Sequence, residues 1–153
     1  MLKLDLRSSL FYIPDESPEP FRGLPFTGES LFCFEVNPDQ GLRIDPQGAA
    51  YLGKLICGGK QDTRAASQKP GPGSFPSLEL PAGKYLFSQI RNLLDREAII
   101  EMAMEIQKEG LWERLRLGRL VYLRYLFEDL SPVTQVFRPF TEPQPQGNPG
   151  DAL

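Results

Sequence analysis

The feature that most constrains the fold is a change of hydrophobic period in the second half of the chain. The stretch LELPAGKYLFSQI (78–90) has the pattern of two strand pieces joined through a Pro-Ala-Gly kink. Residues 95–115 then repeat apolar positions at helical spacing, and 119–128 and 133–139 return to strand-like patterns. Both alternating faces of 119–128 are largely apolar, which predicts a central strand covered on both sides. This order predicts a strand–helix–strand–strand unit, βαββ, whose helix packs on an antiparallel sheet.

The helix of this unit has recognisable ends and faces. Asp95 is placed to cap its N-terminus, because a carboxylate there accepts hydrogen bonds from the unpaired N–H groups of the first turn. One face is apolar and is expected to contact the sheet; it holds Ile99, Ala103 and Ile106. Another face carries an acidic stripe, which is more typical of a solvated surface than of paired catalytic carboxylates: Glu97, Glu101, Glu105 and Glu109.

The first half of the chain is predicted to be rich in strands. Residues 1–57 hold several apolar–polar alternations between Pro and Gly turns, the clearest of them ESLFCFEV at 29–36. The N-terminal LKLDL and SLFYI indicate one interrupted strand or two short ones, and the AAYLGKLICGG run at 49–59 is expected to be extended.

Two segments lack a periodic apolar face. Residues 58–77 are rich in Gly, Pro and Ser, which predicts a flexible loop, either a mobile linker or a lid over a ligand. Residues 141–153 bury too little apolar surface to order themselves and predict a disordered tail. We therefore expect one α+β domain over 1–140, with a strand-rich half at 1–57, the loop, and the βαββ unit at 78–140 with its one main helix.

The charge balance argues against nucleic acid and membranes as partners. The 153 residues include 17 Lys and Arg against 20 Asp and Glu, a net charge of −3, so the chain has no bulk attraction to phosphate backbones or anionic lipid. No apolar run approaches the roughly 20 residues of a membrane span, and the first residues lack the apolar core of a secretory signal. These features predict a cytoplasmic protein, either a monomer or a homodimer.

The absence of histidine narrows the possible chemistry. It removes the commonest general base and the commonest zinc ligand. The two cysteines, Cys33 and Cys57, are too few for a disulfide framework. We therefore expect no metal and no cofactor, and the sequence singles out no catalytic residue, although an enzyme built from this chain would have carboxylates, Tyr, Lys or a thiol to use.

Two motifs of the βαββ unit resemble GyrI-like domains, the small-molecule-binding domains of drug-sensing regulators of transcription. LPAGKYLFSQ (80–89) is similar to the motif that opens the second half of such domains, and TQVFRPF (134–140) is similar to the strand that closes them. The resemblance covers residues 78–140. It implies SHS2-type βαββ units that pack around a pocket for hydrophobic, often cationic, effector molecules.

The resemblance also implies a role for one position of the last strand. GyrI-like domains place there a glutamate that supplies a buried negative charge, and this chain has Gln135 instead. An amide donates and accepts hydrogen bonds but cannot offset a buried cation. We therefore expect neutral or weakly polar aromatic ligands to be preferred over permanent cations.

Aromatic side chains of the unit are the candidates for contact with a ligand. Such residues can line an apolar pocket with a few polar tips, although plain core packing produces the same pattern. Four arginines that alternate with other residue types are interpreted as surface ion-pair partners: Arg114, Arg116, Arg119 and Arg124. The predicted ligand-binding residues, with the Gln135 amide as the polar floor, are Tyr85, Phe87, Trp112, Tyr122, Tyr125, Gln135 and Phe137.

Three classes of function are compatible with these patterns. The preferred hypothesis is a non-catalytic domain that binds a small apolar or aromatic molecule, as a sensor or as a sequestering protein. One alternative is a protein–protein interaction module that uses the edge or apolar face of the βαββ unit. The other is a carboxylate-dependent hydrolase, which requires titratable groups that converge in one pocket.

Overall fold

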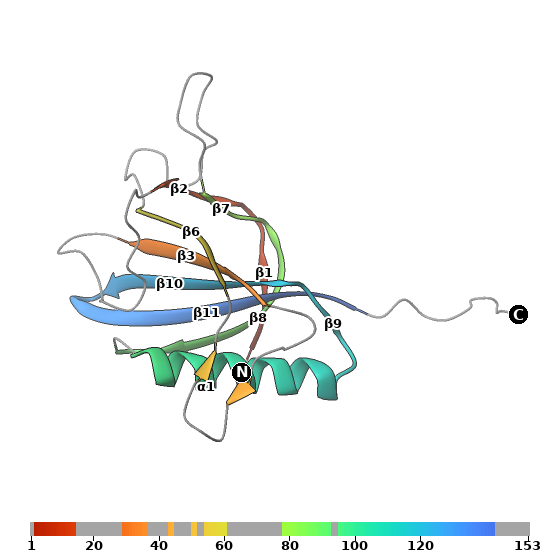
Figure 1. The fold of residues 1–153 in the computed structure, drawn as a ribbon. Coiled ribbons are helices and arrows are strands. Elements are labelled where there is room, and N and C mark those ends of the chain that lie inside the picture. Colours follow the sequence, from red (N-terminus) through yellow and green to blue (C-terminus); the bar gives the residue numbers. More distant parts are fainter. Residues whose placement is uncertain are drawn as a thin grey trace, which may run out of the picture.

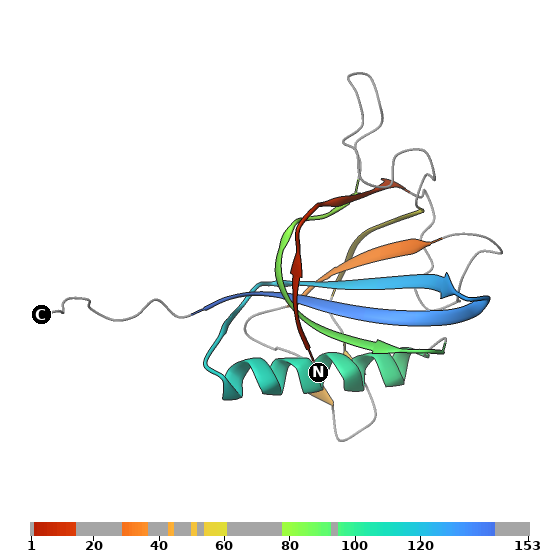
Figure 2. The same cartoon turned by 180° about the vertical axis from the view of Figure 1, so that it is seen from behind.

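The structure, a computed structural model, describes residues 2–14, 29–36, 43–44, 50–51, 54–60, 78–92 and 95–142. Most of these residues form an antiparallel sheet that curls round on itself, with one helix against its outer side (Figures 1 and 2). Residues 43–44 and 50–51 form a separate pair of short strands. The fold class is α+β, as predicted. In the described parts of the chain no helix is long and apolar enough to cross a membrane.

The elements follow the predicted order. The first half contains β1 (Leu2–Leu6), β2 (Leu10–Pro14), β3 (Ser30–Glu35), β4 (Arg43–Ile44), β5 (Ala50–Tyr51) and β6 (Lys54–Lys60). The second half contains β7 (Leu78–Leu80), β8 (Gly83–Ile90), α1 (Arg96–Trp112), β9 (Arg116–Leu117), β10 (Leu120–Glu128) and β11 (Ser131–Thr141). The strand–helix–strand–strand order over 78–140 is therefore observed, and the assignment of this unit to the SHS2 type stays a prediction.

The pairing of the strands makes the sheet curl. Its order is β1–β8–β11–β10–β3–β6–β2–β7, with β9 paired to the end of β11. Only three residues separate β1 from β2, and only Pro81 and Ala82 separate β7 from β8. The β2–β7 pairing therefore continues the β1–β8 pairing, and the sheet curls until Ile13 and Pro14 of β2 meet the end of β6. This gives the sheet a concave inner face and a convex outer face.

The predicted Pro-Ala-Gly kink is the corner at which the sheet turns. Gly83 has a φ of 152°, a conformation that residues with a Cβ rarely adopt. The backbone N–H of Ala82 donates to Oγ of Ser9 at 2.9 Å, which joins this kink to the break between β1 and β2. The hydroxyl of Tyr85 donates to the Pro81 carbonyl at 2.5 Å. Both long strand pairs therefore bend at the same place.

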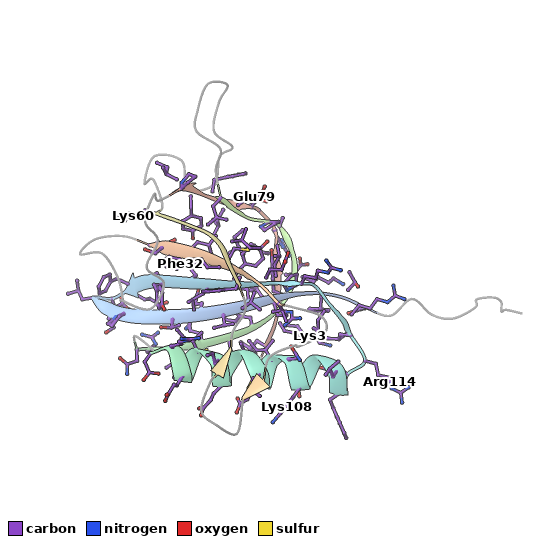
Figure 3. The ribbon with its side chains drawn as sticks, viewed as in Figure 1. Lys3, Phe32, Lys60, Glu79, Lys108 and Arg114 are labelled. Carbon is purple, nitrogen blue, oxygen red and sulfur yellow. The ribbon has the colours of Figure 1, made fainter. Side chains whose placement is uncertain are left out.

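Helix α1 lies against the convex face, with the ends and faces that its sequence predicts. Oδ1 of Asp95 accepts a hydrogen bond from the N–H of Ala98 at 2.9 Å, which confirms the N-cap. Its buried residues pack on alternate residues of the strands, whereas its glutamates are exposed and Lys108 points away from the sheet (Figure 3). The predicted end at residue 115 is wrong, because α1 ends at Trp112 and the backbone then turns through Arg114, at φ 60°.

Each face of the sheet has its own core. The outer cluster, between the convex face and α1, includes Phe32, Leu86, Ile99, Ile100, Ala103, Ile106, Val121, Leu123, Tyr125 and Val136. The inner cluster, on the concave face, contains Tyr12, Leu31, Cys33, Leu78, Leu80, Tyr85, Tyr122 and Phe137. Along β10 the two clusters alternate residue by residue, which confirms that this is a central strand covered on both sides.

The predicted start of the loop at residue 58 is wrong. Strand β6 continues to Lys60, and Gly58 and Gly59 pair with Phe32 and Leu31 of β3. A Cβ at Gly59 would collide with the carbonyl of Ile13, so the missing side chain lets β2 approach β6 where the sheet meets itself. The rest of the predicted loop, 61–77, lies outside the described residues.

The predicted start of the tail at residue 141 is also wrong. Strand β11 extends through Pro139 to Thr141, because Phe140 and Thr141 pair with β9. Pro139 has no N–H to donate, but its carbonyl accepts a hydrogen bond from the N–H of Gly118 at 2.8 Å. Residues 143–153 lie outside the described residues.

Candidate functional site

Side chains on the concave face are ordered in rows that cross the strands. Paired residues of neighbouring strands point to the same side of a sheet, so the register defines each row. One row, here the aromatic row, runs through Cys33, Tyr122, Phe137 and Phe87. The next row on the same face, here the polar row, runs through Leu31, Arg124, Gln135 and Gln89. A largely buried aromatic row therefore lies directly beside a row that contains three polar side chains.

The rings of the aromatic row pack with Tyr85 from the row beyond. The centroids of Tyr85 and Phe137 are 5.7 Å apart and those of Tyr85 and Tyr122 are 6.1 Å apart, both edge to face. Phe87 and Phe137 are 5.0 Å apart. Such contacts between rings are favourable beyond the area that they bury. Burial raises the pKa of Tyr85 to about 12, so its hydroxyl stays protonated at neutral pH.

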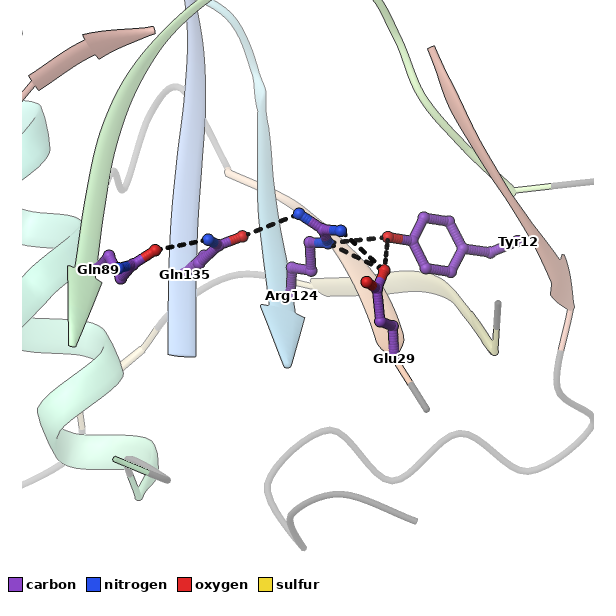
Figure 4. Close-up of polar contacts among 5 residues, drawn as sticks. All are labelled: Tyr12, Glu29, Gln89, Arg124 and Gln135. Carbon is purple, nitrogen blue, oxygen red and sulfur yellow. Dashed lines mark hydrogen bonds and ion pairs between the residues drawn. The ribbon is translucent and has the colours of Figure 1, made fainter. Parts of the chain in front are cut away.

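Arg124 is the centre of the polar row (Figure 4). Its Nη2 donates to Oε2 of Glu29 at 2.8 Å, and its Nε donates to the hydroxyl of Tyr12 at 3.0 Å. The same Tyr12 hydroxyl donates to Oε2 of Glu29 at 3.0 Å. The side chains of Arg124 and Glu29 are 16% and 22% exposed, so this ion pair is largely shielded from water but not sealed.

Two glutamines extend the network across the sheet. Nη1 of Arg124 donates to Oε1 of Gln135 at 3.1 Å, and Nε2 of Gln135 donates to Oε1 of Gln89 at 2.6 Å. Because a guanidinium can only donate, it fixes the carbonyl end of Gln135 toward itself and the NH₂ end toward β8. Gln89 is exposed, so the chain of hydrogen bonds leads from the interior of the curled sheet to solvent (Figure 4).

The surroundings of the network fix its protonation at neutral pH. Burial raises the pKa of Tyr12, an effect that Glu29 reinforces and Arg124 opposes, so the phenol stays neutral. For Arg124, burial alone lowers the pKa, but Tyr12 and Glu29 outweigh this and the pKa is raised. The site therefore holds a permanent guanidinium cation, one carboxylate and neutral donors and acceptors beside an aromatic surface.

The structure brings most of the predicted ligand-binding residues together on the concave face: Tyr85, Phe87, Tyr122, Gln135 and Phe137. It separates the other two from them. Tyr125 belongs to the outer cluster, where its ring meets Phe32 edge to face. Trp112 is 84% exposed at the end of α1. These two residues therefore do not frame the Gln135 amide, contrary to the prediction.

The interpretation of Arg124 as a surface ion-pair partner is wrong, because its ion pair with Glu29 is largely shielded from water. Arg114, Arg116 and Arg119 are exposed, in agreement with that interpretation. The sequence holds a signal for this difference: Arg124 is the one charged residue inside the apolar run LVYLRYLF, in a strand expected to be covered on both faces. Its partners Tyr12 and Glu29 carry no such signal, since they lie far away in the sequence.

No metal-binding group of three or more Cys, Asp or Glu side chains occurs among the described residues. The chain matches no protein-family model, and no curated protein matches it significantly.

Proposed function

We propose that this protein binds a small apolar or aromatic molecule on the concave face of its sheet, without transforming it, and acts as a sensor or a sequestering protein. The observation that carries the proposal is the polar row beside the aromatic row. Ligand sites typically combine a mostly apolar surface with a few convergent polar groups that orient the ligand. The Arg124–Gln135 contact and the rings of Tyr122 and Phe137 supply that combination.

The polar row also supports a preference among ligands. Gln135 contributes no charge, and its carbonyl end is occupied by the Arg124 guanidinium. A cationic ligand placed at Gln135 would lose hydration and would also lie beside a like charge. Cation–π contact with nearby rings recovers only about 0.5–2 kcal/mol. Neutral or weakly polar aromatic ligands are therefore expected to be preferred over permanent cations.

Replacing Gln135 with glutamate tests this preference. The change turns the neutral Arg124–Glu29 centre into one with a net charge of −1. We expect Gln135→Glu to raise the affinity for lipophilic cations by about tenfold, because an added charge-assisted contact contributes about 1.5 kcal/mol. Affinity for neutral ligands is expected to stay unchanged or to fall. Calorimetric titration of both proteins with matched cationic and neutral dyes measures the difference.

A control variant separates the concave face from the helix. Trp112→Ser changes an exposed residue on the other side of the sheet and is expected to leave both dye series unchanged. A wild-type protein that already prefers the cations, or a Gln135→Glu variant that behaves as the wild type in both series, would show that residue 135 does not contact a ligand.

A second function, a protein–protein interaction module, is favoured by one separate observation. Leu111 and Trp112 are 63% and 84% exposed at the end of α1, and exposed tryptophans are frequent anchors of interfaces. Trp112 lines an open surface hollow with Glu105, Lys108 and Glu109. If partners bind there, Trp112→Ser abolishes their capture while the concave-face variants do not. The exposed glutamates of α1 lie on the opposite side of the sheet from the polar row. They therefore do not converge with it in one pocket, as a carboxylate-dependent hydrolase requires.

A further inference from the structure

We propose that the carboxylate of Glu29 occupies the place of a ligand carboxylate, and that the ligand is an apolar carboxylic acid whose acid group replaces Glu29 on Arg124. This inference rests on the proposed function and names the chemical class of its ligand. In the bound state, the acid would accept hydrogen bonds from the Arg124 guanidinium and the Tyr12 hydroxyl, the two groups that now donate to Oε2 of Glu29.

The first step is the chemistry of the groups around Glu29. Arg124 and Tyr12 converge on a single carboxylate oxygen, Oε2, from opposite walls of the curled sheet: Nη2 at 2.8 Å and Nε at 3.3 Å from β10, and the hydroxyl at 3.0 Å from β2. A guanidinium and a phenol that donate to one oxygen form a receptor for a carboxylate, since the contacts are charge-assisted.

The second step is the position of Glu29 in the chain, outside the strands that hold the rest of the network. Tyr12, Arg124, Gln135 and Gln89 all lie within strands, whereas Glu29 precedes the first residue of β3. Moving its side chain away from Arg124 therefore requires no change in the strand pairing. The four other groups keep their positions and would present the same donors to a new carboxylate.

The third step is the surface beside the receptor. Phe137 and Tyr122 of the aromatic row lie two residues along β11 and β10 from Gln135 and Arg124, on the same face. Both rings belong to the inner cluster and are only 2% and 5% exposed, so the apolar tail of a ligand bound at Arg124 would have to open part of that cluster to contact them. The ion pair keeps partial contact with solvent, since its two side chains are 16% and 22% exposed.

Chemical rescue tests this inference. Glu29→Ala removes the internal carboxylate and leaves Arg124 without its counter-charge, which lowers the Tm. We expect millimolar 3-phenylpropionate to raise the Tm of Glu29→Ala by about 3 °C or more, and to bind about tenfold more tightly than 3-phenylpropionamide, its neutral counterpart. The wild type should bind the acid more weakly than the variant does, because Glu29 competes. Each change in Tm is measured relative to a sample that contains sodium chloride at the same ionic strength.

Arg124→Met is the matched control, since it removes the cation and keeps the volume of the side chain. We expect no preference for the acid over the amide in this variant. Glu29→Gln replaces Glu29→Ala if the latter does not fold, and the same acid preference is expected there. Equal binding of acid and amide to the Glu29 variants, or acid binding that survives Arg124→Met, would overturn the carboxylate proposal. If the wild type binds the amide, and binds the acid with equal affinity, the proposed function is supported and only the preference for the acid is refuted. If neither binds any variant, both fall.

Discussion

Phe137→Ala is expected to lower the free energy of unfolding by about 3–5 kcal/mol, the usual result of truncating a fully buried aromatic residue. The ring of Phe137 is 2% exposed, and it contacts both Tyr85 and Phe87 across the aromatic row. Its removal opens a cavity at the centre of the inner cluster, where the curl of the sheet leaves little freedom for neighbours to close in. Chemical denaturation followed by circular dichroism measures the change.

Phe127→Ala is the matched control for this experiment. Phe127 lies on the neighbouring strand β10 but is 44% exposed, so its truncation is expected to cost about 1 kcal/mol or less. Similar losses for the two variants would contradict the description of the concave face as a packed core. Any variant that remains folded also allows a test of binding, because loss of Phe137 removes the ring beside Gln135 whereas loss of Phe127 does not.

Breaking the Arg124–Glu29 ion pair is expected to cause the second large decrease in the free energy of unfolding. Arg124→Met removes the donor to the Tyr12 hydroxyl and the Gln135 carbonyl, and it removes the counter-charge of the Glu29 carboxylate, which still accepts a hydrogen bond from Tyr12. An unsatisfied, largely buried group costs about 1–3 kcal/mol, more when it is charged. We therefore expect the free energy of unfolding to fall by about 2–4 kcal/mol. The double variant Arg124→Met/Glu29→Leu should recover part of it, since it also removes the uncompensated charge.

The chain provides its own reference for this double-mutant cycle. Arg91 and Glu128 form an ion pair at the same 2.8 Å distance, but their side chains are 59% and 42% exposed. Exposed pairs typically show coupling energies of about 0.2–1 kcal/mol. The Arg124–Glu29 coupling should exceed that of Arg91–Glu128 by at least about 1 kcal/mol. Equal coupling energies would mean that water screens Arg124 as fully as it screens Arg91.

Local patterns were enough to predict the βαββ order, the N-cap of α1 and the two faces of β10. They depend on neighbours in the sequence: Asp95 and Ala98 are three residues apart, and the alternation of β10 repeats every two residues. The same alternation already places Tyr122 and Tyr125 on opposite faces, so the pattern itself contradicts their assignment to one pocket. The exposure of Trp112 could not be predicted, because a helical position does not reveal whether the last turn meets the sheet.

The curl of the sheet and the polar network were beyond prediction from the sequence. Both depend on pairings between distant segments, such as β1 with β8. In the polar network, Tyr12 and Arg124 are 112 residues apart in the sequence. No local pattern specifies which strand lies opposite which, because an alternating strand pairs equally well with several others. For the same reason the partners of Arg124 could not be predicted, although its place inside an apolar run distinguishes it from the exposed arginines.

The concave-face site can be tested most directly by a ¹H–¹⁵N NMR titration of the labelled protein with neutral aromatic fragments. The side-chain NH₂ groups of Gln135 and Gln89 give signals of their own, and they lie on the polar row. We expect at least one fragment to shift the Gln135 and Gln89 amide signals together with the backbone signals of Tyr122 and Phe137, in a saturable manner. Fragments that shift only the residues of α1 around Trp112, or that leave the Gln135 signals unmoved throughout, would contradict a ligand site on the concave face.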